Sequence, residues 1–114
     1  MDEPLFFPTR AHVLVCTGPR CSRAGSRSVV ASATAELERR RLAYYKTGGS
    51  VRLSEASCLG ACAHGPTVVA YHGESSGTLA EVWYVGMDSA RVVELAEALH
   101  HGGPPPSTNR FGPR

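Results

Sequence analysis

Four cysteines in two close pairs constrain this 114-residue chain more than any other feature of its sequence. Four residues separate Cys16 from Cys21, and three separate Cys58 from Cys62. Each pair follows a short run of apolar residues typical of a β-strand. Two cysteines this close can bind one metal atom from a single loop, so the spacing favours a metal site built from two loops.

Four thiolates are the ligand set of a [2Fe–2S] cluster, with two thiolates on each iron. On this hypothesis Cys16 and Cys21 bind one iron, and Cys58 and Cys62 bind the other. A structural zinc ion held by the same four cysteines is the main alternative, because zinc sites also use closely spaced pairs. A dithiol redox enzyme is disfavoured because the sequence has no C-x-x-C motif. Four unrelated buried cysteines would not usually fall into two pairs at strand ends.

Charge and composition exclude several classes of protein. The formal net charge is +2, so nothing in the composition demands a nucleic acid as partner. No run approaches the roughly 18 apolar residues of a membrane span. The first residues carry acids where a signal peptide needs positive charge, so we expect a cytoplasmic protein. Cysteines in that compartment are more often metal ligands or catalytic thiols than disulfides.

The hydrophobic pattern predicts an α/β fold with a mixed sheet. Ser26 is the expected N-cap of the first helix, and Asp88 that of the second. The order β-α-β followed by β-β-α predicts a thioredoxin-like arrangement of four strands and two helices. We expect an N-terminal leader (1–10), one domain (11–103) and a C-terminal tail (104–114). The predicted strands are 11–15, 51–54, 67–71 and 81–85, and the predicted helices are 27–42 and 89–100.

Motifs in the same order and spacing resemble the thioredoxin-like [2Fe–2S] ferredoxins over about residues 11–106. The matching text is His12-Val-Leu-Val-Cys16, Gly25-Ser26 before a helix, Cys58-Leu-Gly-Ala-Cys62, Gly65-Pro66-Thr-Val-Val69, and Trp83-Tyr84. The same module occurs in the small [2Fe–2S] subunit of respiratory complex I. The short first cysteine loop is similar to the one in that subunit, but we expect no counterpart here of the N-terminal helical extension that the subunit carries. The resemblance therefore favours a ferredoxin that acts on its own.

The resemblance implies a one-electron carrier rather than an enzyme, with a [2Fe–2S] cluster on Cys16, Cys21, Cys58 and Cys62. Its partners would be redox proteins, such as a reductase or an oxidoreductase, and it implies a homodimer. Two alternatives stay open. One is an accessory [2Fe–2S] subunit of a larger flavin- or NAD-linked oxidoreductase, and the other is a structural zinc module.

Other residues near the cysteines allow two readings each. Arg20, Arg23 and Arg27 flank the first pair, either as a solvated helix start or as a docking patch for an acidic redox partner. His64 is expected to be a surface loop residue rather than a ligand. Pro66 lies where thioredoxins hold a cis-proline, although base rates for X–Pro bonds favour the trans form.

Overall fold

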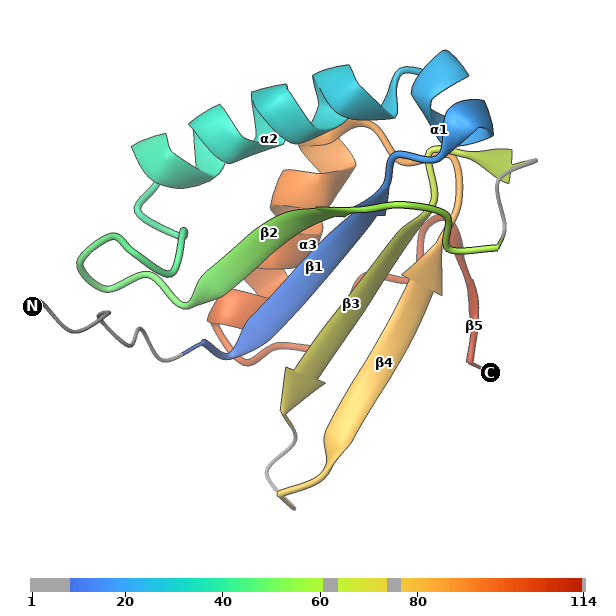
Figure 1. Ribbon diagram of the computed structural model, residues 1–114. Helices are drawn as coiled ribbons and strands as arrows, with labels where there is room; N and C mark the ends of the chain where they lie inside the picture. Colours follow the sequence, from blue (N-terminus) through green and yellow to red (C-terminus); the bar gives the residue numbers. More distant parts are fainter. Residues whose placement is uncertain (1–8, 61–63, 74–76, 114) are drawn as a thin grey trace, which may run out of the picture.

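The structure is a computed structural model that describes residues 9–60, 64–73 and 77–113. Within these residues, strands β1 to β5 form one mixed sheet in the order β2-β1-β3-β4-β5 (Figure 1). Strand β1 runs parallel to β2 and antiparallel to β3, and β4 is antiparallel to β3. The elements are β1 (Ala11–Cys16), α1 (Pro19–Arg23), α2 (Ser26–Arg39), β2 (Val51–Ala56), β3 (Val68–Gly73), β4 (Leu79–Tyr84), α3 (Ser89–His100) and β5 (Arg110–Gly112).

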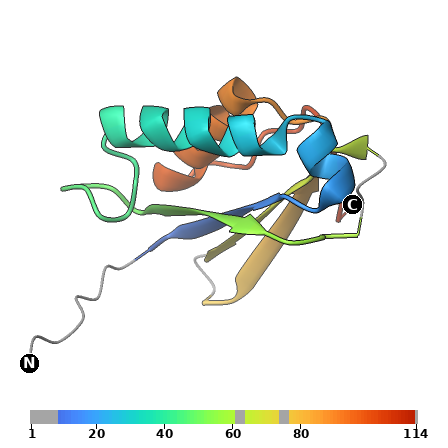
Figure 2. The same cartoon turned by 45° about the horizontal axis from the view of Figure 1, so that its top comes forward.

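The two long helices cover the same face of the sheet. Figure 2 shows α2 and α3 side by side above the strands, with α1 at the end of the sheet where β1 finishes. The core fills the space between this face and the helices. Alternate residues of the strands point into it, and the helices contribute residues three and four apart. Its fully buried members include Val13, Val15, Leu37, Val68, Val82, Tyr84, Val92 and Leu95.

The predicted fold class is confirmed, with two additions. Residues 19–23 form the short helix α1 where a loop was expected, and Pro19 at its start has the fixed φ that suits a first helical residue. Residues 110–112, within the segment expected to be a tail, pair with β4 as the edge strand β5. The sheet therefore has five strands rather than four in the part of the chain described.

Two predicted details of the first long helix are wrong. Ser26 lies inside α2 rather than capping it, because Gly25 takes the cap position with a φ of 93°, which glycine adopts at little cost. The helix also ends at Arg39 rather than at residue 42. The backbone N–H of Leu42 donates to the Leu37 carbonyl, and Arg41 has a left-handed φ of 57°. This turn carries Leu42 into the core.

The second long helix matches its prediction. It spans Ser89–His100, and the Asp88 carboxylate accepts a hydrogen bond from the Arg91 N–H at 2.9 Å. This bond satisfies one of the N–H groups that the first turn of a helix leaves without a partner.

The opposite face of the sheet has no helix over it among the described residues (Figure 2). Leu14, Val69 and Trp83 stand opposite one another on β1, β3 and β4 and form one row across this face. Val69 is fully buried although it lies outside the helix-side core. Phe111 on β5 packs edge-on against Trp83, with ring centroids 6.0 Å apart. None of the described helices combines the length and the apolar character that a membrane crossing needs.

Candidate metal centre

The first cysteine pair lies at one end of the sheet, in a loop closed by hydrogen bonds. Cys16 is the last residue of β1, and Cys21 lies in α1; both are fully buried. The backbone N–H of Ser22 donates to the Gly18 carbonyl at 2.8 Å, and the Ser22 hydroxyl donates to the Thr17 carbonyl, also at 2.8 Å. These bonds close the first loop into a compact turn of helix.

One side of this loop contacts the segment that leads into the second pair. The Thr17 N–H and hydroxyl both donate to the Ala56 carbonyl, at 2.7 and 2.8 Å. The Cys16 Sγ donates to the Ser57 carbonyl at 3.1 Å. Gly18 packs so closely that a Cβ there would lie 3.3 Å from the Cα of Cys58. The first loop and the start of the second are therefore in direct contact.

The other side of the loop contacts the segment that leaves the second pair. The Cys16 N–H donates to the Thr67 carbonyl at 2.9 Å, and the Cys21 Sγ lies 3.9 Å from the buried Thr67 hydroxyl. A Cβ on Gly65 would lie 2.6 Å from the Cys21 Sγ, closer than real Cβ contacts come. Only glycine fits at position 65 without moving this sulfur. The first loop is thus enclosed on both sides by the flanks of the second.

The structure describes three of the four predicted ligands. Cys16, Cys21 and Cys58 lie at the same end of the molecule, and Cys58 is exposed. Cys62 lies outside the described residues. Among residues 9–60, 64–73 and 77–113, no three His, Cys, Asp or Glu side chains are close enough together to hold a metal ion. The donor chemistry and the glycine beside the Cys21 sulfur nevertheless fit a thiolate-bound cluster.

Hydrogen bonds from the C-terminal part of the chain hold the outgoing flank in place. The Gly86 N–H donates to the His64 carbonyl at 2.8 Å, and the Met87 N–H donates to the Pro66 carbonyl at 3.1 Å. The Asn109 side-chain amide in turn donates to the carbonyls of Val85 and Gly86, at 2.9 and 3.1 Å. Sequence reasoning missed Asn109. The only signal was its residue type, because asparagine tolerates the left-handed φ of 68° found there.

Two expectations about this outgoing flank have different outcomes. The His64 side chain is exposed, as expected of a surface loop residue. The Gly65–Pro66 peptide bond is cis, so the trans form that base rates favoured is wrong.

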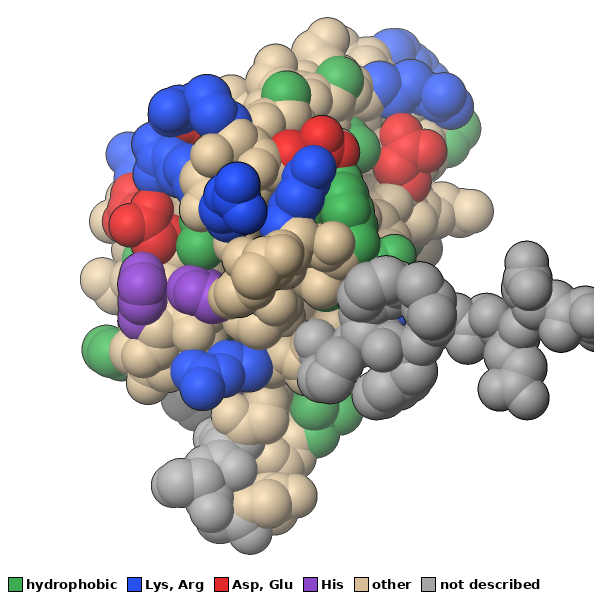
Figure 3. All heavy atoms as spheres, turned by 90° about the vertical axis from the view of Figure 1, so that its left-hand side faces the viewer, with side chains coloured by type: hydrophobic (Ala, Val, Ile, Leu, Met, Phe, Trp, Pro, Cys, Tyr) green, Lys and Arg blue, Asp and Glu red, His purple; other side chains and the backbone are tan. Residues whose placement is uncertain are grey.

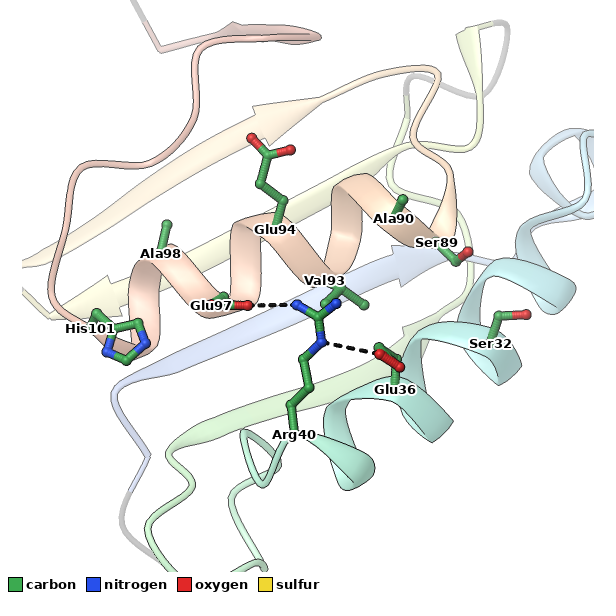
Figure 4. A pocket seen from close by; sticks show the side chains of 10 residues that line it. All are labelled: Ser32, Glu36, Arg40, Ser89, Ala90, Val93, Glu94, Glu97, Ala98 and His101. Atoms are coloured by element: carbon green, nitrogen blue, oxygen red, sulfur yellow. Dashed lines mark hydrogen bonds and ion pairs between the residues drawn. The ribbon is translucent and has the colours of Figure 1, made fainter.

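A groove between α2 and α3 lies away from the cysteines. It has a volume of about 680 Å³, and Arg40 lies between Glu36 and Glu97 across it (Figure 4). The guanidinium nitrogens of Arg40 are 3.1 and 2.7 Å from the two carboxylates. Hydrogen bonds from Arg39 and Arg40 lower the pKa of Glu36 to about 2. Arg40 therefore pairs with both of these carboxylates, and Arg39 pairs with Glu36 as well.

The mixed sheet with both long helices on one face defines a thioredoxin-like fold, with cysteines gathered at one end of the sheet. A family model described as thioredoxin-like [2Fe-2S] ferredoxin matches residues 7–97, so the chain belongs to that family. Membership confirms the predicted family and, with it, the class of cofactor, a [2Fe–2S] cluster.

Solved structures agree with this assignment. The chain is similar to the wild-type thioredoxin-like [2Fe-2S] ferredoxin from Aquifex aeolicus, with 25% identity and a TM-score of 0.69 over 92% of this chain and 99% of the other. A second structure of a thioredoxin-like [2Fe-2S] ferredoxin from Aquifex aeolicus has 26% identity and a TM-score of 0.62, over 84% and 86% of the two chains. A cysteine-to-serine variant of that ferredoxin matches in fold, with 24% identity, a TM-score of 0.68, and coverage of 90% and 99%. No curated protein sequence matches this chain significantly.

Proposed function

We propose that this protein is a soluble, cytoplasmic one-electron carrier whose [2Fe–2S] cluster is bound by Cys16, Cys21, Cys58 and Cys62. The observation that carries the proposal is the enclosure of the first cysteine loop by residues 56–58 on one side and 65–67 on the other. This arrangement brings Cys16, Cys21 and Cys58 to one end of the domain, and Cys62 follows Cys58 by four positions in the sequence. The protein acts as a carrier rather than an enzyme, and it passes electrons between redox partner proteins.

The residues of the site have distinct tasks. A bound [2Fe–2S] cluster supplies one reversible electron. Cys16 and Cys21 are buried and would hold their iron away from water. Gly65 leaves room beside the Cys21 sulfur, and the Thr67 hydroxyl lies where it can donate to the Cys21 thiolate. Cys58 is exposed, so it is the most solvent-accessible of the three proposed ligands that the structure describes.

We also propose that the open face of the sheet binds a second copy of the chain to give a homodimer. The row Leu14, Val69 and Trp83 supplies an apolar centre. A neighbouring row runs from Arg52 on β2 through His12 and Tyr71 to Glu81 on β4. A two-fold axis along the strands would place each Arg52 opposite the Glu81 of the second copy, which makes the face complementary to itself in charge.

A charge swap tests the dimer by analytical ultracentrifugation. Arg52→Glu should weaken self-association, and the double variant Arg52→Glu with Glu81→Arg should restore it. A monomer in the unsubstituted protein at all concentrations would overturn this part of the proposal.

A reductive titration tests the carrier function. The anaerobically purified protein should take up one electron per chain, lose visible absorbance and recover it fully on reoxidation. Cys58→Ser should weaken or shift the visible bands, whereas Ser57→Ala, a neighbouring exposed residue, should leave them unchanged. A Cys58→Ser variant with an unaltered spectrum and full iron content would contradict the ligand set. Isolation from its native cell in a fixed complex with a flavoprotein would instead favour an accessory subunit.

A further inference from the structure

Three arginines are exposed around the helix that carries Cys21. Arg20 and Arg23 lie in α1, and Arg27 lies in the first turn of α2. The hydrogen bonds found for their side chains go to uncharged acceptors. Arg23 Nε donates to the Pro19 carbonyl and Arg27 Nε to the Ser22 hydroxyl, both at 3.4 Å. Within the described residues, none of the three arginines forms an ion pair. We call Arg20, Arg23 and Arg27 the arginine patch.

At the opposite end of the molecule, where α2 finishes, two arginines form ion pairs. Arg39 lies 2.5 Å from Glu36, and Arg40 bridges Glu36 and Glu97. Figure 3 faces that end and shows acidic side chains among the basic ones. The described acids at the cysteine end are Glu55, at the end of β2, and Asp88, whose carboxylate caps α3. Neither forms an ion pair with the arginine patch in the described part of the chain.

The backbone adds to the positive charge of the patch. α2 has 14 residues, and its N-terminus lies beside Arg27. No side chain caps this terminus, and no acidic residue lies in its first turn. Its aligned peptide dipoles therefore add a partial positive charge to that of the three side chains.

We infer that the arginine patch is the docking surface for a redox partner protein that presents an acidic surface. The inference rests on the proposed carrier function and names the partner's charge. Electron transfer slows steeply with distance, so a partner must bind near the cluster, and α1 carries one of its proposed ligands. An exposed patch of one sign raises the rate at which oppositely charged molecules meet it. Three arginines on a chain of formal charge +2 are few for a nucleic acid, whose binding requires many phosphate contacts.

Stopped-flow oxidation of the reduced protein tests the patch with small probes of opposite charge. Each reduced protein gives one electron to hexacyanoferrate(III), which becomes hexacyanoferrate(II), and no bond forms or breaks. Hexaamminecobalt(III) is the cationic comparison. The variants are Arg20→Gln with Arg23→Gln, and the matched control Arg41→Gln with Lys46→Gln, which removes two positive charges at the far end.

The expected result is a slower reaction of the patch variant with hexacyanoferrate(III), by about three- to tenfold at low ionic strength, and no slowing with hexaamminecobalt(III). The difference should vanish near 0.5 M salt, where exposed charges are screened. Equal slowing in the control variant would overturn the inference, because net charge alone would then explain it. Salt-sensitive binding to phosphatidylserine vesicles that the patch variant loses would also overturn it, in favour of a membrane surface. A protein that cannot be reduced at all would refute the carrier function instead.

Discussion

The two ends of this molecule satisfy their polar groups in different ways. At the far end, where α2 finishes, Arg39 and Arg40 pair with Glu36 and Glu97. The Ser50 hydroxyl and the His100 Nδ1 are 2.7 Å apart. At the cysteine end, exposed arginines form no ion pair within the described residues, and α2 starts without a side-chain cap. Thiol groups are buried there against glycine and backbone.

This difference distinguishes an end that serves the fold from an end suited to binding. At the far end, Arg39 and Arg40 pair with carboxylates of the chain itself, as expected of a region that only has to fold. The cysteine end buries the thiols of Cys16 and Cys21 and leaves positive charge at the surface. Both features are understandable if that end binds a cluster and a partner. Substitutions at the two ends should therefore differ in what they change, from cluster binding at one end to small changes in stability at the other.

The largest effect is expected at Gly65. Gly65→Ala places a Cβ 2.6 Å from the Cys21 Sγ, so this sulfur must move and the cluster should be lost or bound in small amounts. Iron content and visible absorbance of the purified variant measure this. Gly73→Ala is the matched control, since a Cβ there meets no atom within 4 Å, and it should retain the full cluster. Equal cluster content in both variants would show that the close contact is unimportant.

A smaller effect is expected at Asn109, which connects the C-terminal segment to the cysteine end. Asn109→Ala removes two hydrogen bonds and should lower the free energy of unfolding by about 1–2 kcal/mol. It should also speed the loss of iron to a chelator, because the turn at residues 85–87 holds the carbonyls of His64 and Pro66.

Asn109→Gly separates the hydrogen bonds from the backbone conformation. Glycine adopts the left-handed φ readily but cannot donate from a side chain. If Asn109→Gly has the stability and iron retention of the unsubstituted protein, the side-chain amide contributes to neither. The role assigned to its hydrogen bonds would then be wrong.

Loss of the cap of α3 should reduce stability without changing the cluster. Asp88→Ala removes the hydrogen bond to the Arg91 N–H and should cost about 1 kcal/mol in urea unfolding. Ser89→Ala, one residue further on, should cost less. A change in the visible spectrum of Asp88→Ala would mean that the cap also positions the cysteine loops.

The smallest effect is expected at Glu36, at the far end. Its folded-state pKa of about 2 lies below the usual 4.5, because Arg39 and Arg40 donate to the carboxylate. The carboxylate therefore stabilises the fold fully above about pH 4.5, and this contribution disappears as the pH falls toward 2. The difference in Tm between the unsubstituted protein and Glu36→Gln should shrink over that range and also in high salt. A difference independent of pH would contradict the ion pair.

Periodicity and local signals predicted most of the fold. The valine-rich runs located four strands, and Asp88 correctly predicted the start of α3, because a carboxylate before an apolar helix is a strong local signal. The edge strand β5 was missed because its three residues, Arg110 to Gly112, have no alternating pattern. The Gly25 cap was missed because its left-handed φ depends on how α1 meets α2, and no single residue encodes that packing.

Sequence spacing predicted the candidate site only in outline. It identified the cysteine pairs, and the motif order indicated the family that the comparison confirmed. It could not show that Gly65 lies against Cys21, or that Asn109 supports the turn beside the second loop, because both contacts join segments far apart in the chain. The ligand set itself stays a prediction, with Cys62 outside the described residues.

The most direct test of a [2Fe–2S] cluster on two cysteine pairs is a count of metal and acid-labile sulfide on anaerobically prepared protein, with an EPR spectrum after reduction. The account predicts about two irons and two sulfides per chain, and an unpaired-electron signal in the reduced form that is absent from the oxidised form. One zinc ion per chain, with neither sulfide nor an EPR signal, would contradict it.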